Sequence, residues 1–563
     1  MNLAVLASSM LSDIHNYPNF TMAPALPDDV LHLLCEHLAE QEQFDTLFNC
    51  ACSSRTLGVP ALTHMYRAHH KAPVRGGEED EGFATNLLMV QKWSILWRSI
   101  IASSLDATLF PYCRYIRTLD FRDLENLLED DNFKSKISKQ FFTGPLETFY
   151  KADTFRNSKG RKYERMNIKA IVEAIGEVVT QQAHMLQMIS GQLTSPALIR
   201  WIPHLPRLQA LEPWDGSALE EALVPEYIRQ HCPSFNSLMI YTWIGQDRDQ
   251  KFSQFISAMR PNSLRNVSTF CDVGAAAETF LALNAHSSTL KELRICISDD
   301  SISHISLLAG CTALEVLRIE DTQGHIVLEE TQNDVYLETI EWLRKCENLH
   351  SLSLSRFLSA ATLVTPLLLE HKIRLRSLEI NSYVLKDSRE FHQALSHQRD
   401  SLEKLSLKGD TDGMFRDDVD IIVDSLKQLK HMTVLKLDLP EMFREEHLIQ
   451  IIAHLGKLKE LSISALELND RVLEHVGNLG GLRLVTLAGI SKFTDDGLFG
   501  FVSRLGPGNK SIQVMIDMAD PDTMLREEQV AVLREFLAEK VGGTLEYIPL
   551  RDPNVPEFEG DSD

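Results

Sequence analysis

The chain has 563 residues, of which 44% are hydrophobic and 24% are charged, values near globular averages that exclude wholesale disorder and collagen-like sequence. At about 150 residues per domain, this length predicts either about four domains or one long repetitive array. The formal net charge of -23 disfavours binding to a phosphate backbone or an anionic bilayer, so we expect no nucleic-acid partner and no membrane partner.

The nine cysteines are an odd number spread thinly along the chain, a distribution that does not indicate a disulfide framework. No segment approaches the ~18 consecutive apolar residues that a membrane helix needs. Residues 1–23 lack the basic flank of a cleaved signal and are expected to form a flexible N-terminus. We therefore expect a protein of the cytoplasm, the nucleus or both.

Three short amphipathic helices are predicted within residues 24–70. The first begins at Pro27, which suits a first helical turn, and the two aspartates that follow complement the helix dipole. The second is predicted to start at Asp45 and the third at Pro60. Three such helices make a core that is too small to be comfortable alone, so this segment is expected to bind a partner. The apolar stripe of the first helix consists of Val30, Leu31, Leu34 and Leu38.

The same segment resembles the F-box, the domain through which a family of ubiquitin-ligase subunits binds its adaptor. The F-box pattern opens with Leu-Pro, then an acidic residue and aliphatic residues at helical spacing, and it continues through a leucine-rich second helix that ends near a cysteine. This chain departs from the pattern at Asp29, where Glu is usual, and at Ala51, where Val is usual. The resemblance covers residues 25–67 and implies contact with a Skp-type adaptor through Leu26, Pro27, Val30, Leu31, Leu34, Leu38, Leu47 and Cys52.

Residues 71–200 are predicted to be mostly helical, with an irregular first repeat. Within them the polar stretch 156–165 indicates an exposed connection, and its SKGRK run is interpreted as a solvated loop.

Residues 201–520 repeat a pattern of three apolar residues at offsets 0, 3 and 5. The first positions, from Leu208 to Leu482, are separated by 24 residues (Leu290 to Leu314) to 35 residues (Leu314 to Leu349), the range of leucine-rich repeats with an outer helix. In each copy, two alternating apolar residues predict a short strand with one face turned inward. A single unit cannot bury these faces, but a stack of units can. The complete copies start at Leu290, Leu314, Leu349, Leu375, Leu402 and Leu458.

Three cysteines occupy one position of this repeat. Cys232, Cys311 and Cys346 each lie three residues before the first apolar position, and the pattern resembles the cysteine-containing subfamily of leucine-rich repeats, in which the cysteine is a small buried residue. The predicted fold class is therefore α/β, with a helical F-box followed by a leucine-rich-repeat solenoid that has parallel strands on its concave face and helices on its convex face.

The longest interval and the C-terminal region deviate from the repeat. Residues 323–334 are predicted to form a surface loop and 335–346 a helix. Residues 521–550 are predicted to form a C-terminal cap, with a helix over 524–540 and a strand over 544–550. Residues 551–563 are predicted to be an acidic, disordered tail.

The residues that flank each inward pair are expected on the concave face. Their charges are mixed in sign, but the three lysines among them predict a small basic patch for an acidic or phosphorylated segment, with an ordinary solvated surface as the alternative. The candidates for substrate contact are Arg294, Arg318, Ser353, Glu379, Lys404, Lys408 and Lys436.

The sequence contains no Gly-rich phosphate loop, no HExxH and no CxxC pair, and Cys50 and Cys52 are too close together for a zinc site without other ligands. We therefore expect no catalytic residues, no cofactor and no metal. An F-box followed by leucine-rich repeats resembles the substrate receptors of SCF-type ubiquitin ligases. That resemblance implies a complex with a Skp-type adaptor and a cullin scaffold, with an unidentified protein substrate on the repeats.

Two alternatives remain open. The chain could be a leucine-rich-repeat scaffold without a role in ubiquitin transfer, with the N-terminal helices as a cap. It could also be a GTPase activator of the repeat type, although the irregular repeat intervals count against this class.

Overall fold

The computed structural model describes residues 26–71, 83–156, 162–384, 388–410, 416–439, 442–521 and 523–550. The flexible segment predicted at 1–23 and the acidic tail predicted at 551–563 lie outside the described residues. The chain divides into two compact units, one up to Leu186 and the other from Gln187 onward, and each is described by itself. Among the residues described, no helix has the length and apolar character needed to cross a bilayer.

Unit 1 opens with three helices, α2 (Asp28–Glu40), α3 (Phe44–Ser53) and α4 (Arg55–Arg67), which we call the head. The third helix begins five residues before the predicted start at Pro60. Ser54 sets this boundary, because its backbone is extended and its side-chain oxygen accepts a hydrogen bond from the Leu57 N–H at 3.1 Å. Pro60 is therefore an interior residue of α4.

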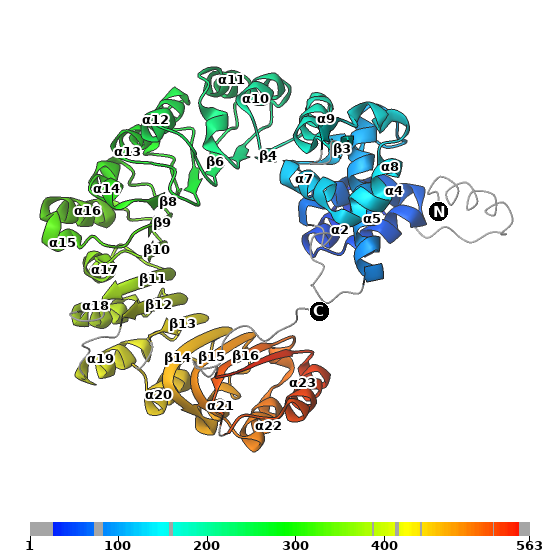
Figure 1. The fold of residues 1–563 in the computed structure, drawn as a ribbon. Coiled ribbons are helices and arrows are strands. Elements are labelled where there is room, and N and C mark those ends of the chain that lie inside the picture. Colours follow the sequence, from blue (N-terminus) through cyan, green and yellow to red (C-terminus); the bar gives the residue numbers. More distant parts are fainter. Residues whose placement is uncertain are drawn as a thin grey trace. The chain divides into compact units, whose positions relative to one another are not determined.

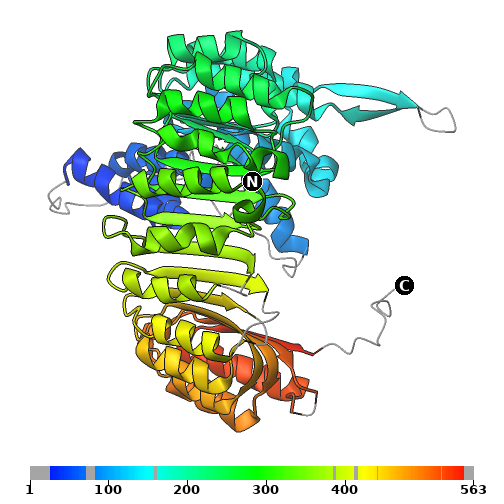
Figure 2. The ribbon, with the colours of Figure 1, turned by 90° about the vertical axis from the view of Figure 1, so that its left-hand side faces the viewer.

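The rest of unit 1 packs around the long helix α5 (Phe83–Ser104). The indole N–H groups of Trp93 and Trp97 both donate to one carboxylate oxygen of Asp123, at 3.0 and 2.7 Å, which satisfies a buried acid. Of the exposed connection predicted at 156–165, residue 156 ends the strand Ala152–Arg156 and residues 162–165 lie in the strand Lys162–Met166. These two antiparallel strands project from the helices of this unit (Figure 2). The other elements are α6 (Tyr112–Tyr115), β1 (Thr118–Asp120), α7 (Phe121–Glu129), α8 (Ser138–Phe141), β2 (Ala152–Arg156), β3 (Lys162–Met166) and α9 (Ile168–Gln182).

Unit 2 is built on one parallel sheet whose strands are neighbours in chain order. Parallel strands need a crossover connection, and each interval between strands supplies one. The strands are β4 (Met188–Gly191), β5 (Ala210–Pro213), β6 (Ser237–Ile240), β7 (Asn266–Thr269), β8 (Glu292–Ile297), β9 (Val316–Asp321), β10 (Ser351–Ser355), β11 (Ser377–Val384), β12 (Lys404–Asp410), β13 (Val434–Asp438), β14 (Glu460–Asn469), β15 (Leu484–Lys492), β16 (Gln513–Ala519) and β17 (Thr544–Pro549).

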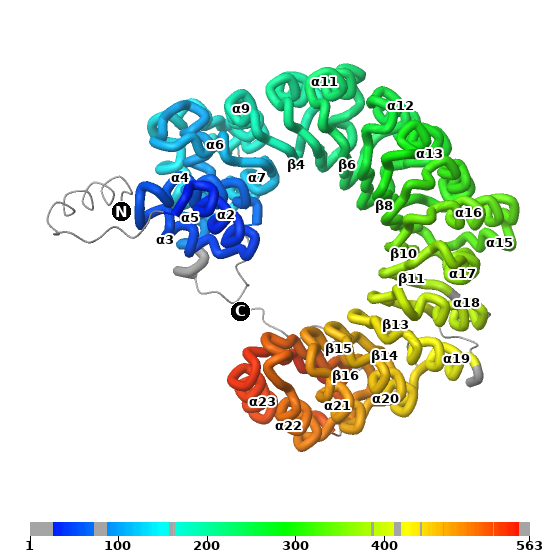
Figure 3. The backbone as a smooth tube through the Cα atoms, turned by 180° about the vertical axis from the view of Figure 1, so that it is seen from behind, coloured from blue at the N-terminus to red at the C-terminus, as the bar shows by residue number. Residues whose placement is uncertain are grey.

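The helices of unit 2 cover the outer side of this sheet, and the strands line its inner side (Figures 1 and 3). The interval predicted as a loop at 323–334 contains the short helix α15, and the helix predicted at 335–346 begins two residues earlier as α16. The helices are α10 (Ser195–Trp201), α11 (Leu223–His231), α12 (Arg248–Ala258), α13 (Ala277–Leu283), α14 (Asp299–Ile302), α15 (Leu328–Thr331), α16 (Asn333–Lys345), α17 (Ala360–Leu369), α18 (Arg389–Ala394), α19 (Arg416–Leu426), α20 (Glu445–His454), α21 (Asp470–Val476), α22 (Asp495–Arg504) and α23 (Glu527–Val541).

The repeated leucines are in register across the sheet. Leu317 of β9 is paired with Leu352 of β10, and the same column continues through Leu378 to Leu405. All four are at most 1% exposed, because side chains alternate along a strand and this column faces the outer helices. Unit 2 is therefore an α/β leucine-rich-repeat solenoid, as the sequence predicts.

Candidate partner-binding surfaces

The head exposes an apolar stripe along α2. Leu26 is 56% exposed, Val30 40% and Leu34 46%, and Leu33 beside them is also exposed. Val30 and Leu34 are one helical turn apart and lie on one side of α2. Leu33 is next to Leu34, and Leu26 lies two residues before the helix begins at Asp28. We call these four residues the α2 stripe. Exposed aliphatic side chains gathered on one face typically mark a surface that another molecule covers.

Other residues that the resemblance assigns to adaptor contact lie inside the head. Leu31 is 6% exposed and Leu47 is fully buried, the latter in a core with Cys35, Ala39 and Ala61. Burial of these two leucines stabilises the head itself, so we assign them a packing role rather than a contact role. The three remaining candidates differ: Leu38 packs partly buried against this core, whereas Pro27 and Cys52 are exposed.

Two buried polar side chains of α4 contact other helices, one within the head and one outside it. A ring nitrogen of His64 lies 3.2 Å from one of His32, and burial, with a smaller effect of Arg67, lowers the pKa of His64 to about 4. The Tyr66 hydroxyl lies 2.6 Å from the Ser99 hydroxyl of α5. These contacts fix the orientation of α4, while the α2 stripe remains uncovered.

The inner face of unit 2 presents the side chains that alternate with the buried leucines. The predicted lysine patch is largely neutralised there. Lys408 forms an ion pair with Asp438 at 2.7 Å, and Lys436 lies 3.9 Å from Glu460. Only Lys404 among the three lysines has no recorded ion pair within the described part of the chain, so these residues do not form a basic patch.

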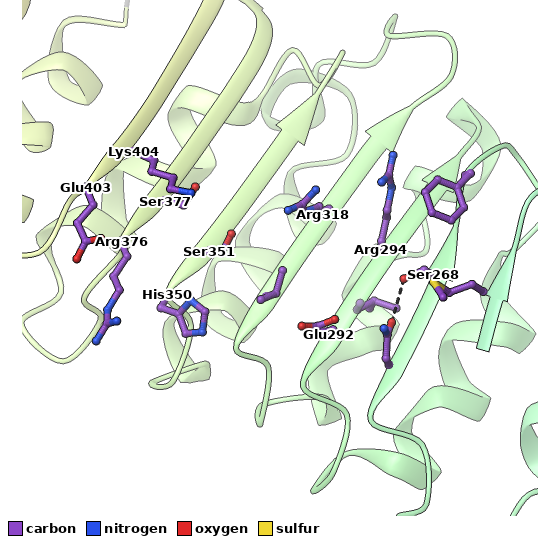
Figure 4. Close-up of a pocket in the computed structure, with 15 residues that line it drawn as sticks. Ser268, Glu292, Arg294, Arg318, His350, Ser351, Arg376, Ser377, Glu403 and Lys404 are labelled. Carbon is purple, nitrogen blue, oxygen red and sulfur yellow. Dashed lines mark hydrogen bonds between the residues drawn. The ribbon is translucent and has the colours of Figure 1, made fainter. Parts of the chain in front are cut away.

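Arginines supply the uncompensated positive charge instead. Arg294 of β8 and Arg318 of β9 are directly opposite each other in the register, and for neither does the structure record an ion pair among the residues it describes. Both line a hollow of about 500 Å³ on the inner face. Figure 4 shows the two side chains on neighbouring strands, with His350 and Arg376 nearer the edge where the strands begin. We call this feature the arginine hollow.

The remaining two candidates for substrate contact interact with each other. Ser353 is 8% exposed and its hydroxyl donates to a carboxylate oxygen of Glu379 at 3.1 Å. The other oxygen of that carboxylate accepts a hydrogen bond from the Asn381 amide at 3.0 Å. Glu379 is thus held in place beside the arginine hollow by neutral donors, and it does not pair with either arginine.

An aromatic ladder that the sequence interpretation missed adjoins the arginine hollow. Trp214 stacks on Tyr241 with ring centroids 5.1 Å apart, and Tyr241 stacks on Phe270 at 4.7 Å. The guanidinium of Arg294 lies 4.3 Å from the centre of the Phe270 ring, a cation–π contact. The sequence does carry a signal for the ladder. Each aromatic residue lies three positions after the first core-facing residue of its strand, as Trp214 does after Leu211.

The residues that the structure describes include no group of three or more His, Cys, Asp and Glu side chains that could hold a metal ion. What the two units offer are surfaces: the α2 stripe, the aromatic ladder and the arginine hollow.

No protein-family model matches the chain, and no curated protein matches it. Among solved structures, the complex of Rad7 and Elc1 from yeast is 11% identical with a TM-score of 0.36, over 79% of this chain and 96% of that chain. The leucine-rich-repeat protein LegL7 from Legionella pneumophila is 14% identical with a TM-score of 0.29, over 52% of this chain and 86% of that chain. Similarity at this level assigns no function. The fold rests on the parallel strand order and the aligned leucine register, which together form a leucine-rich-repeat architecture suited to binding proteins.

Proposed function

We propose that this chain is the non-catalytic substrate-recognition subunit of an SCF-type ubiquitin ligase. In this proposal the head binds a Skp-type adaptor and, through it, a cullin scaffold, while the solenoid binds a protein substrate. The chain would contribute no reacting group. It would instead hold substrate lysines near a charged ubiquitin-conjugating enzyme, which turns a slow encounter into a nearly intramolecular one.

The observation that carries the proposal is the exposure of the α2 stripe. Leu26, Val30 and Leu34 occupy the F-box-like positions and remain 40 to 56% exposed, although the head has its own core around Leu47. Single exposed aliphatic residues are ordinary on a protein surface, but several of them gathered on one face typically mark a surface that another molecule covers. These exposed aliphatic side chains therefore favour an external partner over a simple cap.

The test replaces Val30 and Leu34 with lysine in the full chain. Because both side chains are exposed, the fold should tolerate the change, and the melting curve should match that of the parent protein. Burying one aliphatic side chain in an interface contributes about 1.5 to 3 kcal/mol, so we expect binding to the purified adaptor to weaken by about 100-fold or more. Calorimetric titration measures this, and pulldown from cells reports the cullin.

Leu281→Lys is the matched control, since Leu281 is a 56% exposed leucine of α13 in the solenoid. It should leave adaptor binding unchanged. Equal adaptor recovery by the parent and the Val30/Leu34 variant would contradict the proposal. A parent protein that recovers no adaptor, yet retains a stable partner on the repeats, would identify it as a scaffold without a role in ubiquitin transfer.

A further inference from the structure

We propose that the arginine hollow and the aromatic ladder together bind an extended, acidic peptide segment, with an anionic side chain between Arg294 and Arg318 and an apolar side chain against the ladder. As a statement about the substrate, this inference rests on the proposed function. The existence of the binding site is argued from the geometry of the inner face alone.

The pairing of two arginines is the first step. Arg294 and Arg318 are direct cross-strand neighbours, at the ~4.8 Å spacing of adjacent strands, and like charges in that position destabilise a sheet. Their neighbours in the same row are serines, Ser268 on one side and Ser353 on the other. Side chains that start from adjacent strands are long enough to turn both guanidinium groups toward one carboxylate or phosphate, which would relieve the repulsion.

Of the carboxylates near the two arginines, one is ion-paired with another arginine, one is held by neutral hydrogen-bond donors, and one lies in another row. Glu320 pairs with Arg356 at 2.6 Å, and Glu379 accepts from Ser353 and Asn381. Glu292 lies one row nearer the start of the strands (Figure 4). The charged lining of the hollow is Arg294, Arg318, Arg376 and Lys404 against Glu292 and Glu403.

The sign of this lining decides the class of ligand. Four basic and two acidic side chains line the hollow, and Glu379 beside Arg294 and Arg318 makes the local charge 4 - 3 = +1, on a chain whose formal net charge is -23. Such a site attracts a single negative group, whereas the rest of the chain repels a long polyanion. The ladder rings also stack on one another rather than standing apart as separate platforms for bases. A peptide that places one anionic side chain there fits both features better than single-stranded RNA does.

The ladder supplies the apolar half of the site. Trp214, Tyr241 and Phe270 follow three neighbouring strands, β5, β6 and β7, and Arg294 on β8 continues the row. Trp214 is 44% exposed. Large aromatic side chains that remain exposed are frequent anchor points in protein interfaces. The ligand therefore carries its anionic group next to an aromatic or aliphatic residue.

The experiment uses the full chain and an array of synthetic 12-residue peptides in three sets: neutral sequences, sequences with Asp or Glu, and sequences with phosphoserine. Each set varies Phe, Trp and Leu around the central position. We expect the two anionic sets to bind above the neutral set, and comparison of carboxylate with phosphate peptides identifies which anion is preferred. The strongest peptide is then measured by fluorescence polarisation.

Arg294→Gln with Arg318→Gln should weaken that peptide by 30-fold or more, and Trp214→Ala by about 10-fold. Lys408→Gln with Lys436→Gln is the matched control, because these two cations on the same face are already ion-paired, and it should change affinity less than twofold. Arg318→Gln alone, at an exposed position, provides a milder variant whose melting curve should match that of the parent.

Three results would overturn the inference: equal binding of neutral and anionic peptides, unchanged affinity in the arginine variants, or displacement of the peptide by a 12-nucleotide RNA at lower concentration than by unlabelled peptide. Failure of this inference can be distinguished from failure of the proposed function. The Arg294/Arg318 variant should still bind the adaptor, and the Val30/Leu34 variant should still bind the peptide.

Discussion

The Gln398 side chain stabilises the turn before strand β12 through four hydrogen bonds. Its amide nitrogen donates to the carbonyls of Leu368 and Ile373 at 3.0 and 3.2 Å, and its amide oxygen accepts from the Leu375 N–H at 3.1 Å and the Ser401 hydroxyl at 2.9 Å. The residue is fully buried. Backbone groups of the preceding repeat that have no strand partner are thus satisfied by one side chain.

Buried cysteines at the corresponding turns play a similar part. The Cys232 thiol lies 3.3 Å from the carbonyl oxygen of Leu205, and the Cys346 thiol lies 3.7 Å from that of Cys311. Burial raises the pKa of both thiols to about 12, so each remains a neutral S–H donor. The sequence interpretation of these residues as small core groups captures their burial but not their hydrogen bonds.

Replacing Gln398 with methionine should destabilise unit 2 by about 2 to 4 kcal/mol, because the volume is nearly retained while buried donors and acceptors lose their partner. Chemical unfolding followed by circular dichroism measures the change. Gln428→Met is the control, since Gln428 is exposed on the same type of repeat, and a surface change of this kind stays within about 0.5 kcal/mol. Equal effects of the two substitutions would refute a role for the Gln398 network.

His392 makes the stability of the solenoid depend on pH. It is fully buried, one ring nitrogen lies 3.2 Å from the Tyr383 hydroxyl, and Nδ1 has no hydrogen-bond partner among the residues that the structure describes. Burial lowers the pKa of His392 to about 4, from about 6.5 in an unfolded chain. The unfolded chain therefore takes up a proton first, and the stability present above about pH 6.5 is lost as the pH falls toward 4.

Lowering the pH from 7.5 to 5 should reduce the free energy of unfolding of the parent protein by about 2 kcal/mol more than that of the His392→Gln variant. The figure follows because pH 5 lies roughly 1.5 units below the pKa of histidine in the unfolded chain. The glutamine can keep the hydrogen bond to Tyr383 but does not titrate. Urea unfolding at the two pH values measures the difference. His371→Gln, at an exposed histidine, should behave like the parent, and a variant at position 392 with the full pH dependence would rule out this origin.

At the scale of single elements, the strands of unit 2 follow from the sequence more closely than the helices of unit 1. Each complete copy of the apolar pattern marks one buried pair, such as Leu405 and Leu407 of β12. Side chains alternate between the two faces of a strand, so only one face can be turned toward the core. The start of α4 was misjudged, since the cap at Ser54 determines it and Pro60 is tolerated inside the helix. The hairpin β2–β3 was missed because its short, exposed strands have no apolar alternation to reveal them.

The candidate binding surfaces, too, can be predicted from the sequence only in part. The alternation of side chains along a strand correctly assigns Arg294 and Arg318 to the concave face. The ion-pair partner of each charged residue, however, depends on which residue of the next repeat lies opposite it. Lys408 meets Asp438 although 30 residues separate them, and repeats of unequal length hide such pairs from a reading of one repeat at a time. The sequence predicts an apolar stripe on this helix that includes Val30 and Leu34 but not Leu33. Only the coordinates separate exposed Leu34 from buried Leu31.

At the scale of the whole molecule, each unit has its own core, and within the solenoid each repeat depends on its neighbours. The last repeat has a neighbour on one side only. Helix α23 covers it through Leu533 and Leu537, both 1% exposed, and Phe536 stacks with Phe499 of α22 at 5.8 Å. On β17, the Leu545 carbonyl accepts a hydrogen bond from the Arg534 guanidinium at 3.1 Å. From these contacts we expect residues 523–550 to act as a structural cap for the sheet.

A chain that stops at Asp520 should therefore expose the edge of β16 and the apolar surface that α23 covers. We expect it to self-associate, to elute ahead of the full chain in size-exclusion chromatography with light scattering, and to melt at least about 5 °C lower. Val532→Asp, at a 54% exposed position of α23, leaves the cap in place and should behave like the parent. A truncated chain with the parent's elution and melting temperature would mean that the repeats upstream of α23 are stable without a cap, and that the solenoid's stability does not depend on covering its last strand.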